Sequence, residues 1–346
     1  MIYFNNDYSE GCHPAVLRKL VNTNLEQTPG YGMDHYCAEA AAHIRRLCEN
    51  DALDVHFLVG GTQTNLVVID AALRPHQAAL GAVSAHINVH ETGAVEATGH
   101  KVLSVSSDDG KITAQQITEA AVSHRSDEAF EHISQPKMVY ISNPTELGTI
   151  YTLQELEEIS AACRDNGMYL FLDGARLGYG LTAQGNDVTL ADLARLCDVF
   201  YIGGTKVGAL FGEAVVFSNH AISEDFRYLM KQHGGMLAKG RLLGVQFCAL
   251  MENGLYFEMG KHANRLADQI RDTLKSLGYS LLVPGVTNQV FAILPDALLE
   301  ELAKRFSFTE QCRVNDRHRA VRFCTSWAST QANVDALCDE LVRLSK

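Results

Sequence analysis

The stretch MYLFLDGAR, residues 168–176, decides the fold class of this chain. Five apolar or aromatic residues run without interruption up to Asp173, the pattern of a strand that is buried on both faces of a parallel sheet. The preceding residues, 152–167, have the periodicity of an amphipathic helix that ends at Gly167. A helix that leads directly into a fully buried strand indicates an α/β fold.

The same alternation extends over the first two thirds of the chain. Apolar, strand-like runs at 54–61, 137–144 and 198–204 are separated by helix-like segments such as 62–75. Strands that alternate with helices predict a mostly parallel sheet with helices on both faces. We therefore expect a large domain of α/β class.

The last third of the chain has a different pattern. A long helical region, 240–278, is followed by strand-like runs, among them 288–295 and 320–327, and by a closing amphipathic helix. This order predicts a smaller α+β domain. The expected division is a large domain over 1–249, which includes the N-terminal segment, and a C-terminal domain over 250–346, a size range that is ordinary for domains.

Composition restricts the kinds of partner. The chain of 346 residues is 47% hydrophobic and 20% charged, with a formal net charge of -12, which argues against a nucleic-acid or anionic-membrane surface. No apolar run reaches the roughly 20 residues of a membrane span, and the N-terminal residues lack the pattern of a secretory signal. Nine scattered cysteines without a CxxC pair are typical of reduced thiols, so we expect a cytoplasmic protein.

Lys206 is the single charged residue in VFYIGGTKVGALFG, residues 199–212. An ammonium group held against apolar walls loses hydration, which favours the neutral amine. A neutral amine is a nucleophile that forms Schiff bases with carbonyl compounds. The alternative is a loop lysine whose stem lies on the surface while its head reaches water.

A glycine-rich turn follows the strand-like run 54–61. Gly60, Gly61 and Thr62 lead into a helix, where a close backbone approach and free N–H groups suit a phosphate. The turn is neither a GxGxxG nor a Walker A motif, which disfavours dinucleotides and nucleoside triphosphates. The alternative is an ordinary strand-to-helix turn with Thr62 as N-cap.

Four other residues suggest chemistry. Asp173 ends an apolar strand and needs a partner, which in the alternative interpretation is Arg176. His86 and His90 have helical i, i+4 spacing, which suits either a metal pair or an imidazole that stacks on a planar ligand. Arg322 points out of an apolar strand and suits a carboxylate, or else lies on an edge strand facing solvent.

The set as a whole meets the needs of pyridoxal phosphate (PLP). The aldehyde of PLP needs a lysine, its ring nitrogen needs an anionic partner, and its phosphate needs several N–H donors. An amino-acid substrate also needs a cationic group that binds its carboxylate. The chain supplies these groups with Lys206, Asp173, the Gly61–Thr62 turn and Arg322. His86 adds an imidazole ring that can stack on the cofactor. We therefore expect PLP as cofactor, a small amino acid as substrate and no metal.

Six short blocks carry a family resemblance: DGARL, which is the most specific, GGTQTNL, AHINVHETGA, YGMDHY, TKVGALFGEA and VRFCTSW. Over nearly its whole length the chain resembles the PLP-dependent threonine aldolases of the aromatic amino acid β-eliminating lyase/threonine aldolase family. The resemblance implies the fold-type I architecture and aldol cleavage of L-threonine, L-allo-threonine or phenylserine to glycine and an aldehyde. The alternatives are a PLP-dependent β-eliminating lyase and a non-catalytic PLP-binding protein.

The resemblance also implies residue roles. Lys206 forms the Schiff base, Asp173 pairs with the pyridine nitrogen, and His86 stacks on the ring and relays a proton. These three are the expected catalytic residues. The further residues expected to bind the cofactor are Gly61, Thr62, Arg176, Tyr31 and Arg241.

The substrate carboxylate is implied to contact Asn6, Arg176 and Arg322. Tyr31 and Arg241 match blocks that reach the cofactor of a neighbouring subunit, so a homodimer or homotetramer with shared sites is expected.

Two positions depart from the family pattern. SNPTELGT, residues 142–149, replaces a frequent Glu-Asn-Thr-His-Asn run, so Thr145 stands where a second active-site histidine is often found. Asn6 replaces a frequent serine. These changes leave the proton acceptor and the preferred substrate side chain open, and we expect Thr145 at most to hold a water.

Overall fold

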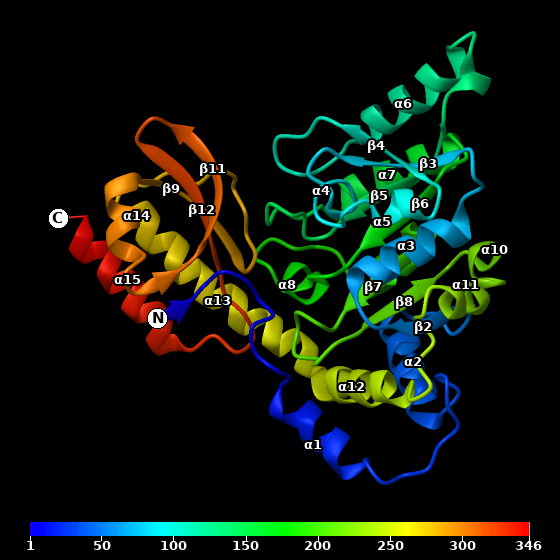
Figure 1. Ribbon diagram of the computed structural model, residues 1–346, viewed down its shortest axis with the longest axis horizontal. Coiled ribbons are helices and arrows are strands. Elements are labelled where there is room, and N and C mark those ends of the chain that lie inside the picture. The colour runs from blue at the N-terminus through cyan, green and yellow to red at the C-terminus, as the bar shows by residue number, and fades with distance from the viewer. Residues whose placement is uncertain (346) are drawn as a thin grey trace.

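The computed structural model describes residues 1–345, and its centre is a seven-stranded sheet (Figure 1). In spatial order the strands are Asp54–Leu58 (β2), Glu213–Phe217 (β8), Val199–Gly203 (β7), Tyr169–Asp173 (β6), Gln135–Ser142 (β5), Gln77–Ala82 (β3) and Lys101–Val105 (β4). The five strands from β7 to β4 pair in parallel, and β8 is antiparallel to both of its neighbours. The predicted mostly parallel sheet is confirmed.

Helices cover both faces of this sheet. Along β6 the side chains alternate, with Leu170 and Leu172 in one core and Phe171 in the other, as a strand with two buried faces requires. The first core is completed by Pro14–Asn22 (α1), His35–Leu47 (α2), Ala114–Ser126 (α6), Leu153–Asp165 (α7), Leu177–Leu181 (α8), Leu190–Leu196 (α9) and Arg241–Met251 (α12). The second is completed by Gly61–Ala72 (α3), His86–Val89 (α4), Ala94–Ala97 (α5), His220–Ser223 (α10) and Phe226–Gln232 (α11).

The C-terminal part has its own antiparallel sheet, which confirms the predicted smaller α+β region. Its strands, in the order β11-β12-β9, are Thr309–Asn315, His318–Cys324 and Gln289–Pro295. The helices beside them are Leu255–Ser276 (α13), Asp296–Leu302 (α14) and Gln331–Leu344 (α15). Figure 1 shows α13 running from the large sheet to this part. Within residues 1–345, no helix combines the length and the apolar character that crossing a bilayer demands.

The predicted helical region 240–278 is interrupted between α12 and α13. Asn253 and Gly254 have φ values of 53° and 73°, in the left-handed region, which breaks the helix into two. Periodicity alone did not reveal this break, because apolar residues continue on both sides of it.

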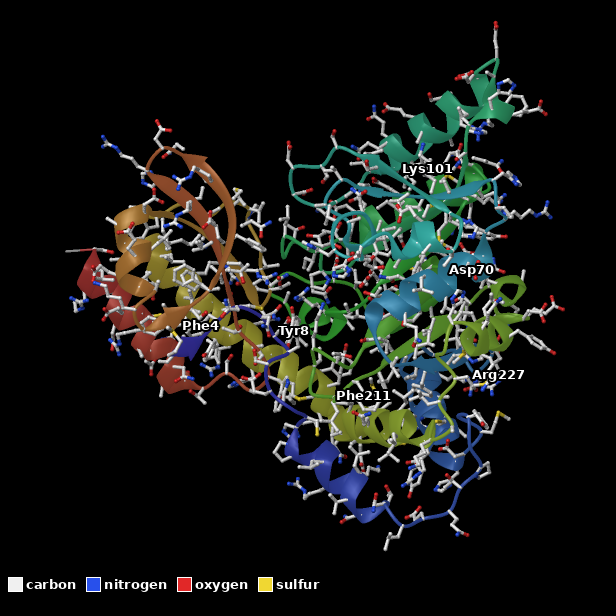
Figure 2. The ribbon with its side chains drawn as sticks, viewed as in Figure 1. Phe4, Tyr8, Asp70, Lys101, Phe211 and Arg227 are labelled. Atoms are coloured by element: carbon white, nitrogen blue, oxygen red, sulfur yellow. The ribbon has the colours of Figure 1, made fainter. Side chains whose placement is uncertain are left out.

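The first residues of the chain pack on the C-terminal part. Ile2–Tyr3 (β1) pairs in parallel with Phe306–Ser307 (β10), and Phe4 is buried in the C-terminal core. Figure 2 shows Phe4 within that part and Tyr8 where the two parts meet. The N-terminal segment, which we expected with the large domain, therefore links the two parts, and the division into 1–249 and 250–346 stays a prediction.

Candidate active site

Most of the predicted site residues converge where the strands of the large sheet end. Asp173 is the last residue of β6, Lys206 follows β7, and α3 begins at Gly61 after β2. Together with Thr62 and His86 they line one cavity of about 310 Å³. Ligands of α/β proteins bind at the carboxyl ends of the strands, so this cavity is the candidate active site.

Lys206 is half-buried and lines this cavity. Burial lowers the pKa of its ammonium group, and the nearby guanidinium of Arg176 lowers it further, while the carboxylates of Asp7, Asp173 and Glu213 act in the opposite direction. No ion pair to Lys206 is present among the residues that the structure describes. These conditions favour the neutral, nucleophilic amine over the alternative of a lysine whose head reaches solvent.

Asp173 is a buried carboxylate whose oxygen atoms are both hydrogen-bonded. Oδ2 accepts from the hydroxyl of Tyr140 and from Asn65 Nδ2 at 3.0 Å, and Oδ1 accepts from the N–H of Ala175 at 2.9 Å. Burial by itself raises the pKa of Asp173, but the hydrogen bonds, led by that of Tyr140, outweigh it and leave the pKa below its usual range. A fixed negative charge therefore faces the cavity.

The alternative in which Arg176 pairs with Asp173 is wrong. The guanidinium of Arg176 instead binds the carboxylate of Asp7 with two hydrogen bonds, at 2.7 and 3.0 Å. Asp7 is fully buried and also accepts from Asn288 at 2.9 Å. Arg176 still lines the cavity, and Asp7 fixes the orientation of its guanidinium. The predicted contact of Arg176 with a ligand stays a prediction.

The glycine turn before α3 has the form of an anion cup. The N-cap is Gly60, in an extended conformation and without a side-chain cap, so the alternative with Thr62 as N-cap is wrong. The N–H groups of Gly61 and Thr62 belong to the first turn of a 12-residue helix, where no intrahelical acceptor exists. A Cβ atom at Gly61 would lie 3.1 Å from the hydroxyl of Tyr201, so little room is left for a larger residue.

His86 is held in place by two carboxylates. Its Nδ1 lies 2.8 Å from Glu91 Oε1, and its backbone N–H donates to Glu146 Oε1 at 2.9 Å. The ring of His90 is 5.5 Å away between centroids, and it does not line the 310 Å³ cavity but an adjoining one that Lys206 also lines. Within residues 1–345, no three histidine, cysteine or acidic side chains are arranged to hold a metal ion. The ring of His86 is thus positioned at the edge of the cavity.

A second cavity, of about 530 Å³, adjoins the first and contains Arg322. The guanidinium of Arg322 donates to Gln289 Oε1 at 3.0 Å and to the carbonyl oxygen of Asn5 at 2.9 Å. Its buried Nε has no hydrogen-bond partner among residues 1–345. Arg322 therefore keeps unused donors beside an open space, which suits the binding of a carboxylate.

Asn6 does not line either cavity. Its side-chain oxygen accepts from the N–H of Tyr8 at 3.0 Å and from the hydroxyl of Ser9 at 2.9 Å, which fixes a local turn. The contacts with the site come from its neighbours, because Asn5 binds Arg322 and Tyr8 lines both cavities. The predicted contact of Asn6 with the substrate stays a prediction.

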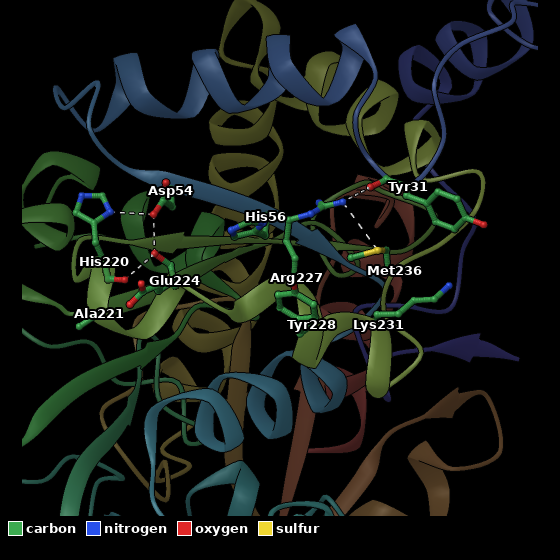
Figure 3. A pocket seen from close by; sticks show the side chains of 11 residues that line it. Tyr31, Asp54, His56, His220, Ala221, Glu224, Arg227, Tyr228, Lys231 and Met236 are labelled. Carbon is green, nitrogen blue, oxygen red and sulfur yellow. Dashed lines mark hydrogen bonds and ion pairs between the residues drawn. The ribbon is translucent and has the colours of Figure 1, made fainter.

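Tyr31 and Arg241 lie away from Lys206. The residue before Arg241, Gly240, packs on the Tyr31–Gly32 backbone, so the two predicted residues are neighbours. Tyr31 is 46% exposed and borders a separate cavity of about 1020 Å³, in which Arg227 points to the carbonyl oxygen of Tyr31 (Figure 3). Neither residue lines the cavity of Lys206 in its own chain.

Three acidic residues of the site were missed at the sequence level: the buried Asp7 and Glu213, and the half-buried Glu146. Glu213 accepts from the N–H of Gly204 and the hydroxyl of Thr205, and burial raises its pKa to about 8. A signal existed for Glu213, because it opens an apolar strand directly after the Lys206 block. No comparable signal marks Asp7, whose neighbours are polar.

Thr145 does not reach the site. Its hydroxyl lies 2.7 Å from that of Thr149 and contacts the carbonyl oxygen of Asp109, so the expectation that it holds a water at the site is wrong. The next residue, Glu146, lines the cavity instead.

The residues present fit pyridoxal phosphate. One cavity brings together a desolvated amine, a carboxylate that is ionised at neutral pH and a helix N-terminus without a capping side chain. Lys206, Asp173 and the Gly61–Thr62 turn match the aldehyde, the ring nitrogen and the phosphate in that order. The fold and this cavity define a fold-type I PLP enzyme.

Comparisons with known proteins agree with this class. The family described as Beta-eliminating lyase matches residues 7–297, and the chain belongs to this PLP-dependent family. A low specificity L-threonine aldolase of Pseudomonas sp. (strain NCIMB 10558) is 31% identical over 98% of this chain and 96% of its own length. The structure of a threonine aldolase of Leishmania major is 46% identical, covers 100% of both chains and superimposes with a TM-score of 0.97. An aspartate aminotransferase variant of Thermus thermophilus, 16% identical over 99% of this chain and 91% of its own with a TM-score of 0.72, shares the fold alone.

Proposed function

We propose that this protein is a PLP-dependent lyase that cleaves β-hydroxy-α-amino acids to glycine and an aldehyde. L-Threonine, L-allo-threonine and phenylserine are the substrates proposed. The observation that carries the proposal is the pair of adjoining cavities, one with Lys206 and Asp173 and the other with Arg322. The names of the relatives from Pseudomonas and Leishmania support it.

When bound, pyridoxal phosphate supplies an aldehyde that condenses with an amine and a ring that accepts the electron pair released at the substrate's α-carbon. Lys206 provides the amine, and its lowered pKa keeps Nζ available as a nucleophile. Asp173 keeps a negative charge in the cavity, and this charge would hold the ring nitrogen of a bound cofactor protonated. Gly61 and Thr62 offer N–H groups to the phosphate.

Arg322 selects which bond at the α-carbon breaks. A guanidinium that holds the carboxylate with two hydrogen bonds fixes the rotation of the substrate about its Cα–N bond. Because Arg322 would hold the carboxylate, the bond from Cα to the carboxylate would be kept from breaking, which leaves Cα–H and Cα–Cβ. A β-hydroxyl group that can lose its proton makes Cα–Cβ the bond that breaks.

The test is an analysis of the products from threonine, allo-threonine and phenylserine. We expect equal amounts of glycine and the matching aldehyde, and neither product from the Lys206→Ala variant. The matched control is Lys304→Ala, since Lys304 is an exposed lysine paired with Glu301 on α14. Ammonia and a keto acid without glycine would instead identify a β-eliminating lyase, and no product at all would leave a PLP-binding protein.

The proposal includes a homodimer or homotetramer with shared sites. Tyr31 and Arg241 are neighbours that lie away from the cavity of their own chain, and the buried Nη1 of Arg241 has no partner. If a neighbouring subunit placed its Tyr31 and Arg241 beside the Lys206 of this chain, both residues would contact the cofactor there. Mixed oligomers of Lys206→Ala and Arg241→Ala subunits should regain activity that neither variant has alone, whereas lack of recovery would contradict shared sites.

The proposed compartment is the cytoplasm. All nine cysteines are unpaired, and most of them are buried. Unpaired thiols in such number are typical of a reducing compartment.

A further inference from the structure

We propose that Glu146 is the group that takes the proton from the substrate's β-hydroxyl during cleavage. The inference rests on the proposed function and names the residue that performs its proton transfer. It assigns a role to the residue next to Thr145, which itself does not reach the site.

The first argument is position. Five residues line both adjoining cavities, and Glu146 is the only carboxylic acid among them; the five are Tyr8, His86, Glu146, Arg176 and Lys206. A substrate whose carboxylate binds Arg322 and whose amino group lies toward Lys206 has its β-carbon near the wall that the two cavities share. Glu146 is the carboxylic acid on that shared wall, so it is the acidic group within reach of the β-hydroxyl in this placement.

The second argument is orientation. Glu146 Oε1 accepts from the backbone N–H of His86 at 2.9 Å and from the hydroxyl of Ser142 at 2.7 Å. Oε2 accepts no hydrogen bond from any residue that the structure describes, and it is not among the buried atoms that lack a partner. One oxygen thus fixes the carboxyl group, and the other is free for a hydroxyl or a bridging water.

Other acid–base side chains also line the two cavities. The Nδ1 atom of His86 is held by Glu91, and Asp173 accepts three hydrogen bonds. His90 lines only the second cavity, and burial lowers the pKa of its ring, which makes it a weaker base. His86 would lie against a bound cofactor ring, with its other nitrogen as the rival proton acceptor. Glu146 and His86 can be separated by experiment, because only Glu146 carries a carboxyl group.

The surroundings also suit a base. Burial raises the pKa of Glu146, and the Asp173 charge adds to this, while the hydrogen bonds from Ser142 and His86 act against it. A carboxyl group with a raised pKa is a stronger base and transfers protons more effectively near neutral pH. The titratable and charged groups around it are Asp173 on β6, Tyr140 on β5, Tyr151 beyond β5, His86 and His90 of the α4 segment, Arg176, Lys206, and Arg322 on β12.

The proposed step is balanced without any further reactant. The O–H bond of the substrate breaks, its proton goes to Glu146 Oε2 directly or through one water, and its electron pair forms the C=O bond of the aldehyde. The Cα–Cβ bond breaks, and its electron pair remains on the glycine part until Cα takes up a proton. Glu146 releases its proton afterwards, so the protein returns to its starting state.

The main test compares Glu146→Gln with Glu158→Gln, an exposed glutamate on α7 that undergoes the same chemical change. We expect kcat for phenylserine and threonine to fall on the order of 10²–10⁴-fold in Glu146→Gln, the range of general acid–base catalysis, with KM nearly kept. Exchange of the glycine α-proton in heavy water should persist, since it needs no β-hydroxyl base. Glu158→Gln and Thr145→Ala should retain cleavage.

The pH profile gives a second readout. Because the pKa of Glu146 is raised, the wild type should lose kcat as pH falls through that raised value, and Glu146→Gln should lack this acid limb. Ser142→Ala keeps the carboxyl group but removes a hydrogen bond that lowers its pKa, so the limb should move to higher pH. The Ser142→Ala variant tests the proposal even if Glu146→Gln fails to fold.

A third readout needs no turnover. The infrared difference between wild type and Glu146→Gln, both without cofactor, should show a carboxyl band that titrates above the usual range of glutamate. Wild-type kcat in Glu146→Gln, or an acid limb that moves only in His86→Asn, would overturn the assignment. If the wild type itself releases no glycine and aldehyde, it is the proposed function that fails.

Discussion

Asp173 and Arg322 lie at opposite ends of the candidate site, and their surroundings differ. Asp173 is buried, and both of its oxygens are hydrogen-bonded, so its charge is fixed before any ligand arrives. Arg322 is half-buried, uses only part of its donors and keeps a buried Nε without a partner. Under the proposed function, Asp173 marks a cofactor end that is preorganised, which would lower the barrier, and Arg322 marks a substrate end that only the ligand would complete.

The two ends also come from different parts of the fold. The cofactor end is built from neighbouring strands of one rigid sheet, β6 and β7, with the first turn of α3. The substrate end joins β12 of the C-terminal part to the N-terminal segment through Arg322 and Asn5. We therefore expect variants at the first end to change kcat and variants at the second to change KM.

The largest effect is expected from Asp173→Asn. The amide keeps the shape of the side chain but removes the negative charge that holds the ring nitrogen protonated, so kcat should fall on the order of 10²–10³-fold, with little change in KM. Steady-state kinetics on phenylserine measure both constants, and cofactor absorbance shows whether PLP is still bound. A variant with normal kcat would break the distinction between the two ends.

A smaller effect is expected from Arg322→Ala. Loss of the guanidinium should raise KM roughly 30-fold, or about 2 kcal/mol, since Arg322 is only half-buried and water replaces part of the contact. Lys206 should still react with PLP in this variant. An unchanged KM would show that Arg322 does not bind the substrate and would support the alternative of a solvent-facing arginine on an edge strand.

Asp7→Asn tests how much the buried Asp7–Arg176 pair contributes to the stability of the protein. The Asp7–Arg176 pair is buried, and removal of one partner leaves a buried guanidinium without its counter-charge, a loss of about 3 kcal/mol in the free energy of unfolding. For the exposed pair of Lys304 with Glu301, Glu301→Gln should cost less than about 1 kcal/mol. Urea unfolding of the two variants measures the difference, and equal losses would contradict a special role for the buried pair.

The same pair predicts a pH dependence. Burial raises the pKa of Asp7, but the charges of Arg176 and Lys206 and the hydrogen bonds of Arg176 and Asn288 outweigh it, and the pKa is lower in the folded protein than in the unfolded chain. The stability that Asp7 contributes is therefore fully present above its unfolded pKa of about 3.9 and is lost as pH falls through the lower folded value. Asp7→Asn should lack this part of the acid dependence.

The sequence indicated that Asp173 and Lys206 lie close together, and there is a physical reason for this. Asp173 and Lys206 each adjoin a run of consecutive apolar residues, and parallel strands bring such ends to one edge of a sheet. The substrate end was predicted less completely. Arg176 pairs with Asp7 across 169 positions of the chain, and no local pattern announces a contact of that range.

Local geometry explains the remaining misses. In the loop after β5 the sequence could not decide whether Thr145 or Glu146 faces the cavity, because that depends on the backbone path of the turn. The structure turns Thr145 toward Thr149 and Glu146 toward His86. The pairing of β1 with β10 was likewise invisible, since two-residue strands carry no periodicity.

The most direct test of the central claim is to trap the cofactor on the protein. Borohydride reduction of the PLP-loaded protein, followed by peptide mapping, should place a single pyridoxyl group on Lys206, and Lys206→Ala should carry none. A pyridoxyl group on another lysine of the wild type, such as Lys231 beside Tyr31, would contradict the assignment of the active site.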